Sequence, residues 1–313
     1  MGKLIIDTDC GLDDANAILL ALSHPDTQVL AITMVDGNTC LDNVVQNVLR
    51  VLRAAGRQDI PIYRGSACSM LNLPRKCASD YHGEDGLGDF PDHEPVSTEQ
   101  LQQEHAVWAL VRLLREHDDV DLVCLGPLTN LALAIRLEPA LGNRIRRLCI
   151  MGGNYKGKGN ITMTGEFNFY RDPEAAHVVL HDLTDSCQVT MVGWEVCAES
   201  MVTFETAEQL MLQGCGPKAD FVRSIYANVL RQRLLPGFVF CDELAMACLL
   251  WPQVARQTER ARFRVELAGH WCRGMAVPDW ESLDTGEHQP MVTMVTSVDM
   301  TRFLDLMRAC LNG

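Results

Sequence analysis

The stretch KLIIDTDCGLDDANAILLALS, residues 3–23, places four aspartates between a short apolar run and a helical pattern. Lys3–Ile6 predicts a strand, and Asp13–Ser23 predicts a helix that stops before Pro25. Further along the chain, apolar runs with β-branched members alternate with helical stretches in the same way. Such alternation is typical of βαβ units, in which helices cover both faces of a mostly parallel sheet.

This alternation extends over most of the sequence. Further strands are predicted at 28–34, 60–63, 121–125, 147–151 and 188–192, and helices at 41–55, 98–116 and 298–311. The segment 66–99 is irregular and rich in Gly, Pro and Asp, which is typical of a functional or mobile insert. Loops and strands are expected over 266–300. Residues 1–313 contain no evident repeat or linker, so we expect one Rossmann-like α/β domain.

Composition excludes several classes of function. The 313 residues are 47% hydrophobic and 22% charged, as in ordinary globular proteins. The net charge of −14 disfavours binding to nucleic acids or to anionic membranes. Thirteen cysteines without a CxxC pair, and an N-terminus with no signal-peptide pattern, indicate a cytoplasmic protein with free thiols. The apolar runs are too short to cross a bilayer.

The four aspartates after the first strand are Asp7, Asp9, Asp13 and Asp14. They repel one another, and no Lys or Arg occurs between positions 4 and 49. Helix capping would explain one or two of them. A hard divalent cation such as Ca²⁺, which prefers oxygen ligands, would explain all four, so the sequence favours a metal site.

Polar residues also follow other predicted strands. Ligands of open α/β sheets bind beyond the carboxyl ends of the strands, where Asn38 and the segment Gly126-Pro127-Leu128-Thr129-Asn130 are expected. Taken alone, the latter segment is explained by a helix N-cap at Thr129 or Asn130. Asn160, Glu166 and Asn168 lie among apolar residues and indicate either hydroxyl recognition or a solvated loop.

Two further positions stand out. His82 lies in the irregular insert, where a functional histidine is more plausible than in a core. Asp242 precedes an apolar helical run, and local sequence favours it as the N-cap of that helix.

Together these motifs resemble the inosine–uridine preferring nucleoside hydrolases, over most of the chain and in the family's order. The family signature Asp-x-Asp-x-Gly-x-Asp-Asp is reproduced by residues 7–14. The other matching motifs are Gly37-Asn38, His82–Leu87, Gly126–Asn130, Met151–Gly153, Glu166–Asn168 and Asp172–Ala176.

The resemblance implies a role for each matching position. A Ca²⁺ ion would be bound by the carboxylates of Asp9, Asp14 and Asp242 and by the carbonyl of Thr129. It would hold the ribose 2′ and 3′ hydroxyls and one water, for which Asp9 would be the general base. The sugar hydroxyls would be bound by Asp13, Asn38, Asn160, Glu166, Asn168 and Asp242.

The implied reaction is hydrolysis of the N-glycosidic bond of ribonucleosides. Its transition state resembles an oxocarbenium ion, whose positive charge carboxylates would stabilise. The acidic composition suits nucleosides better than phosphorylated substrates. The resemblance also implies a homodimer or homotetramer.

The chain departs from the family in three places. Cys10 follows the second aspartate, Cys241 stands where many relatives have His, and Trp194-Glu195-Val196-Cys197 replaces a common Leu-Asp-Val-Thr stretch. The sugar and metal half is intact, while the base-leaving half is altered. We expect His82 to assist the leaving base and Cys241 to be mainly a packing residue, and the nucleobase preference stays open.

Two other functions are compatible with parts of the pattern. A Mg²⁺-dependent phosphatase of the haloacid-dehalogenase type also carries Asp-x-Asp after its first strand, although no obvious lysine motif follows here. A nucleoside or ribose binder that has lost its leaving-group acid is the second alternative.

Overall fold

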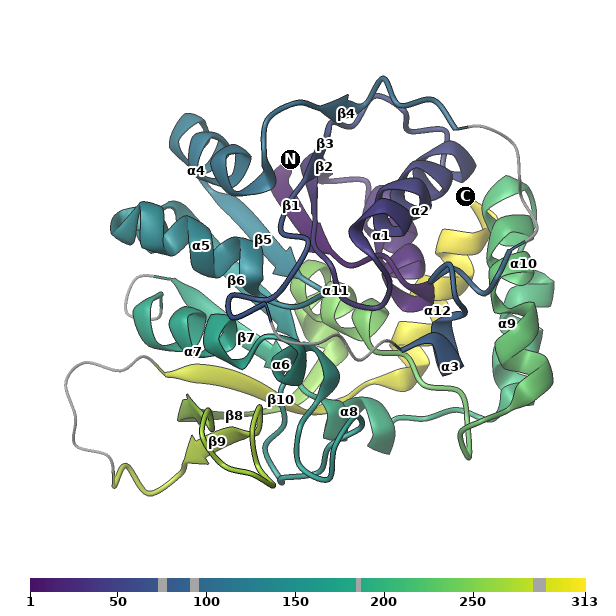
Figure 1. Ribbon diagram of the computed structural model, residues 1–313. Helices are drawn as coiled ribbons and strands as arrows, with labels where there is room; N and C mark the ends of the chain where they lie inside the picture. The colour runs from purple at the N-terminus through teal and green to yellow at the C-terminus, as the bar shows by residue number, and fades with distance from the viewer. Residues whose placement is uncertain (73–77, 91–95, 184–186, 284–290) are drawn as a thin grey trace.

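The computed structural model describes residues 1–72, 78–90, 96–183, 187–283 and 291–313. The strands in these segments are β1 Gly2–Thr8, β2 Thr27–Met34, β3 Ile62–Arg64, β4 Leu101–Gln102, β5 Val120–Cys124, β6 Ile145–Met151, β7 Gln188–Val192, β8 Ala255–Val265, β9 Ala276–Asp279 and β10 Val292–Val298. They form a ten-stranded sheet in the order β4-β3-β2-β1-β5-β6-β7-β10-β8-β9 (Figure 1). Neighbours from β4 to β10 are parallel, and β8 and β9 add an antiparallel edge.

Helices cover both faces of this sheet. They are α1 Leu12–Ser23, α2 Leu41–Ala54, α3 Ser79–His82, α4 Ala106–Glu116, α5 Thr129–Leu137, α6 Phe167–Arg171, α7 Pro173–Asp182, α8 Trp194–Glu199, α9 Phe204–Gln213, α10 Pro217–Gln232, α11 Asp242–Leu250 and α12 Met300–Asn312. Two short 3₁₀ helices span Pro139–Arg144 and Pro252–Val254. One face is packed by α1, α2 and α9–α12, and the other by α4, α5 and α7 (Figure 1). The predicted Rossmann-like, single-domain α/β fold is confirmed.

The order of the strands explains where a ligand can bind. From β1 the chain proceeds outward through β2, β3 and β4, and then returns to β5 on the other side of β1. Loops after β1 and β5 therefore leave the sheet in different directions, and a crevice forms between them. The four-aspartate loop follows β1, so it lies at this crevice.

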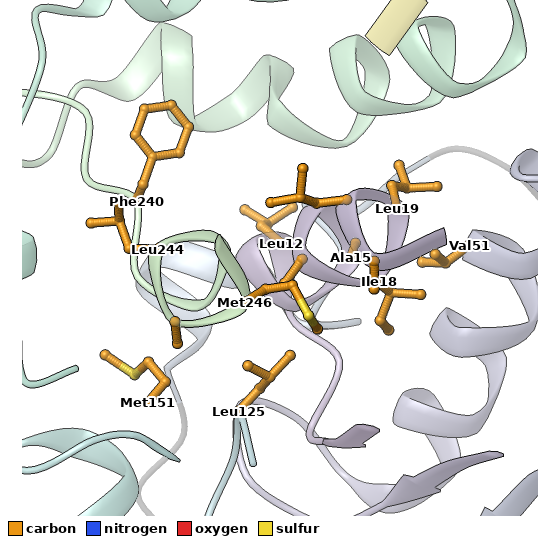
Figure 2. Close-up of a cluster of buried hydrophobic side chains, with 14 of the residues drawn as sticks. Leu12, Ala15, Ile18, Leu19, Val51, Leu125, Met151, Phe240, Leu244 and Met246 are labelled. Carbon is orange, nitrogen blue, oxygen red and sulfur yellow. The ribbon is translucent and has the colours of Figure 1, made fainter. Parts of the chain in front are cut away.

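Buried apolar packing fixes the helices that flank the crevice. Leu12 and Ala15 of α1 and Leu244 and Met246 of α11 belong to one fully buried cluster (Figure 2). Burying a large apolar side chain contributes about 1.5–3 kcal/mol, so several of them hold α1 against α11 firmly. This packing places the first residues of both helices, Asp13, Asp14 and Asp242 among them, at one end of the sheet.

The structure differs from the prediction at one helix and at one strand. The helix predicted from residue 98 begins only at Ala106, where His105 accepts the N–H of Val107 at 3.3 Å. Before it, Leu101–Gln102 pairs with β3 as a short edge strand, so pairing prevailed over helical periodicity. Strand β8 was not predicted, because exposed charged side chains hide its apolar alternation. No helix among the described segments is long and apolar enough to cross a bilayer.

Candidate active site

A cleft of about 260 Å³ opens beyond the carboxyl ends of the central strands. It is lined by eight of the side chains selected from the sequence: Asp13, Asn38, His82, Asn160, Glu166, Asn168, Cys241 and Asp242. The other selected residues, Asp9, Asp14 and Thr129, are buried. An apolar wall completes the cleft, with Tyr81, Ile161, Phe167, Trp194, Leu235 and Val239 among its members. Trp194 had been assigned to the altered base-leaving half of the site, whereas no role was predicted for Tyr81, Leu235 or Val239.

Carboxylates from two distant parts of the sequence meet at this cleft. One side-chain oxygen from each of Asp13, Asp14 and Asp242 lies within 4.8 Å of the others. Asn38 connects Asp9 to them, since its backbone N–H donates to Asp9 Oδ2 at 2.7 Å and its amide to Asp14 Oδ2 at 3.2 Å. The trio therefore contains Asp13, which the resemblance assigned to the sugar, and Asp9 lies beside it.

The electrostatics of this acidic group favour a bound cation. Burial raises the pKa of Asp13 to about 6, and burial together with neighbouring carboxylates raises the pKa of Asp9, Asp14 and Asp242 above the usual range. Asp9 Oδ1 and Asp13 Oδ1 are buried and find no hydrogen-bond partner among the described residues. A divalent cation would reverse the repulsion and occupy these oxygens, so the donor set fits a hard ion.

Helix capping accounts for only part of the aspartate loop. Asp14 Oδ2 accepts the N–H of Gly11, the N-cap of α1, at 2.8 Å. Asp7 belongs to a separate network, in which its Oδ1 accepts from Thr33 at 2.5 Å and from Asn130 at 2.8 Å. Capping therefore explains Asp14, and strand anchoring explains Asp7. Neither explains Asp9 or Asp13.

The capping positions predicted for two other segments are wrong. Cys241 occupies the N-cap position of α11, and Asp242 is its first residue, with a carboxylate that joins the acidic trio. Leu128 is the N-cap of α5, so neither Thr129 nor Asn130 has that role. The Thr129 hydroxyl donates to Asp172 at 2.6 Å, and the use of its carbonyl as a metal ligand stays a prediction.

The predicted sugar-binding residues differ in how firmly they are held. Glu166 is buried and accepts the N–H groups of Gly153 at 2.8 Å and Asn168 at 2.9 Å, and burial raises its pKa to about 7. The Asn168 amide donates to the carbonyls of Leu125 and Met151, so only its Oδ1 can serve a ligand. The solvated-loop alternative is wrong for these two buried residues, whereas Asn160 is exposed at the rim.

Two further side chains that line the cleft, His82 and Cys241, are the candidates for assisting the leaving base. His82, at the end of α3, accepts the N–H of Leu12 on Nδ1 at 3.1 Å, and burial lowers its pKa to about 4. Its imidazole is therefore neutral at neutral pH and carries its proton on Nε2. A hydrogen bond to Cys197, followed by burial, raises the pKa of Cys241 well above the thiol's usual value. Both side chains are therefore neutral hydrogen-bond donors at neutral pH.

The apolar wall shows what local sequence signals miss. Trp194 follows β7 directly and is half-buried at the start of α8, and Leu235 and Val239 come from the segment before α11. Trp194 was marked in the sequence by its departure from the family pattern, and its position just after a parallel strand is a second signal. Leu235 and Val239 follow no strand, and only the fold brings them here.

Known proteins and a family model match almost the whole chain. The family model described as "Inosine-uridine preferring nucleoside hydrolase" matches residues 4–305. An inosine-uridine preferring nucleoside hydrolase of Leishmania major is 36% identical over 286 residues, covering 89% of this chain and 88% of that protein. The pyrimidine-specific ribonucleoside hydrolase RihA of Citrobacter koseri is 36% identical over 310 residues, covering 97% and 96%.

A solved structure shows the same likeness in three dimensions. The inosine-guanosine nucleoside hydrolase (IG-NH) superposes with a TM-score of 0.91 at 33% identity, covering 99% of this chain and 98% of that one. Fold and sequence together set aside the haloacid-dehalogenase alternative. The chain belongs to the inosine-uridine preferring nucleoside hydrolase family.

Proposed function

We propose that this ribonucleoside hydrolase depends on calcium and accepts both purine and pyrimidine ribonucleosides, which it splits into ribose and free base. The observation that carries the proposal is the cleft itself, which is lined by members of a buried acidic group, by the predicted sugar-binding side chains and by an apolar wall. The acidic group suits a cation that holds a diol. The aromatic side chains of Tyr81 and Trp194 offer flat apolar surface that suits either kind of nucleobase.

Calcium is proposed because every donor available is a hard oxygen. Asp13, Asp14 and Asp242 would hold the ion, with Asp9 beside them. When bound, the cation supplies positive charge and coordination sites for the ribose hydroxyls and for a water. The unpartnered Oδ1 atoms of Asp9 and Asp13 are the side-chain atoms that such an ion or its ligands would satisfy.

The chemical step is then assigned to side chains of this chain. Asp9 Oδ2 is fixed by the N–H of Asn38, which leaves Oδ1 to take a proton from the attacking water. Positive charge develops on the sugar as the glycosidic bond breaks, and the surrounding carboxylates stabilise it. Asn168 is held by two carbonyls, so its Oδ1 can orient a sugar hydroxyl.

The departing base needs either a proton or a strong hydrogen bond. We expect the neutral His82 to supply a hydrogen bond from Nε2, because a pKa of about 4 leaves it no imidazolium proton to give at neutral pH. We expect His82→Ala to lower kcat on natural nucleosides by about 10²-fold, the usual cost of removing one hydrogen-bond donor to developing negative charge. The loss should be equal at pH 6 and pH 8, because a pKa of about 4 keeps the ring neutral at both. Cys241→Ala should keep most activity, since its thiol is already paired with Cys197.

A substrate that needs no proton provides the control for this assignment. Nitrophenyl riboside releases nitrophenolate, which is stable as an anion. His82→Ala should therefore lower its rate of hydrolysis far less than that of inosine or uridine. Full activity of His82→Ala on natural nucleosides, together with an inactive Cys241→Ala, would reverse the two assignments.

Recognition of the diol gives the test of the proposed function. A site built around two hydroxyls leaves its own polar groups unsatisfied when one hydroxyl is missing. We expect kcat/KM for 2′-deoxynucleosides to fall by at least about 10²-fold relative to ribonucleosides. Steady-state rates on matched ribo and deoxyribo pairs measure this, and comparable values would show that the sugar is not held by its diol.

A further inference from the structure

A buried carboxylate next to the cleft accepts hydrogen bonds from the loop 155–161, which carries residues at the rim of the cleft. Glu195, the second residue of α8, is 1% exposed. Its Oε2 accepts the N–H of Tyr155 at 3.0 Å, and its Oε1 accepts those of Lys156 at 2.8 Å and Lys158 at 3.2 Å. Three main-chain donors of one loop therefore converge on one side chain, and hydrogen bonds to a charged acceptor are the strong kind.

The loop held in this way carries cleft residues at its far end. Asn160 and Ile161 line the cleft, and both of their N–H groups point to the carbonyl of Gly165, at 3.2 and 3.3 Å. The side chain of Asn154 donates to the carbonyls of Lys158 and Thr164, which closes the loop on itself. The loop is thus bonded to itself, and it is attached to the body by Glu195 and by Asn154, whose Oδ1 accepts the N–H of Ala276 at 3.0 Å. These attachments determine where Asn160 lies.

Helix α8 is itself fixed against the sheet at the same point. The N–H of Trp194 donates to the carbonyl of Gly153 at 3.0 Å, and Gly153 follows β6 directly. Trp194 lines the cleft while its neighbour Glu195 faces the loop. One turn of α8 thus connects the apolar wall, the end of β6 and the loop that carries Asn160.

We infer that Glu195 is a positioning residue for substrate binding, acting through the loop 155–161 to place Asn160 on the sugar. This inference rests on the proposed function only for the identity of the substrate. Glu195→Gln replaces one acceptor oxygen by an amide nitrogen, which then faces main-chain N–H groups instead of accepting from them. The loop should become more mobile, so the affinity for the nucleoside should fall more than the rate of the chemical step.

The same helix offers a matched control. Glu199 is half-exposed and bonds the Nζ of Lys156 at 2.7 Å, so Glu199→Gln removes an equal charge from α8 at a second contact with the same loop. An exposed ion pair of this kind contributes little. Glu195→Asp keeps the carboxylate on a shorter stem and should fall between the wild type and Glu195→Gln.

Kinetics and proteolysis test the inference separately. Glu195→Gln should raise KM for inosine by about tenfold with a smaller change in kcat, and Glu199→Gln should leave KM within about twofold. Because Glu195 acts through Asn160, adding Glu195→Gln to Asn160→Ala should change KM little further. Trypsin cleavage after Lys156 and Lys158, both exposed, should accelerate by about tenfold in Glu195→Gln.

The outcomes are distinct. If Glu195→Gln equals Glu199→Gln in both KM and cleavage rate, or if its effect is fully retained in the Asn160→Ala background, Glu195 does not position the loop. If the wild type releases no ribose, the proposed function fails, and the trypsin rates still decide whether Glu195 anchors the loop. If Glu195→Gln does not fold, the trypsin cleavage rate of Glu195→Asp is measured instead. A rate equal to that of the wild type would then overturn the inference.

Discussion

Asp9→Asn is expected to lower kcat by about 10⁴-fold while leaving the fold intact. The substitution removes the general base, and it also removes a negative charge beside the oxocarbenium-like cation that forms in the transition state. The carboxylate is buried, and Oδ2 already accepts the N–H of Asn38, a bond that an amide oxygen can keep. Oδ1 has no partner among the described residues, and this is the atom that the substitution disables. Single-turnover rates on inosine and uridine, with calcium saturating, measure the loss.

Asp7→Asn is the matched control for Asp9→Asn. Asp7 lies near the end of β1, two residues before Asp9, is also buried, and bonds Thr33 and Asn130. Its replacement should affect stability more than kcat, with the rate within about tenfold of the wild type. If Asp9→Asn keeps kcat within the range of Asp7→Asn, another group must activate the water.

Asp242→Asn should weaken calcium binding by about 10³-fold, equivalent to about 4 kcal/mol. Its carboxylate is 2% exposed and lies with those of Asp13 and Asp14, whose charges, after burial, raise its pKa. In the metal-free protein the same substitution removes a buried repulsion, so its Tm should not fall below that of the wild type. Calcium should then raise the Tm of the wild type strongly and that of the variant weakly.

Isothermal titration with calcium and thermal unfolding with and without the ion measure both effects. Asp305→Asn, an exposed position on α12 paired with Arg308, changes the charge equally and should leave both unchanged. Equal calcium affinity in Asp242→Asn and the wild type would show that the acidic trio does not bind the ion.

Local signals explain why much of the fold and half of the site could be predicted. The strand ends after β1 and β2 are marked by polar residues that immediately follow apolar runs, so Asp9, Asp13 and Asn38 were found from short stretches of sequence. Parallel pairing then brings these loops to one edge of the sheet, where Asn38 bonds both Asp9 and Asp14.

Other features depend on contacts between distant segments, which local patterns do not contain. Local sequence favoured Asp242 as an N-cap, because helix starts favour aspartate, and only the family resemblance assigned it to the metal. In the fold its carboxylate instead joins two others from α1. Leu235 and Val239 carry no local signature, and Glu195 was visible only as a departure from a family pattern. Its role follows from main-chain donors that lie 37–40 residues away in the sequence.

Release of free ribose from inosine and uridine, measured with added calcium and with a chelator, decides whether this cleft hydrolyses nucleosides with the help of calcium. We expect equal amounts of ribose and free base, a loss of release when calcium is removed, and its return when calcium is restored. A purified protein that binds these nucleosides in the presence of calcium and releases no ribose would contradict this expectation, and would instead identify a nucleoside-binding relative that has lost catalysis.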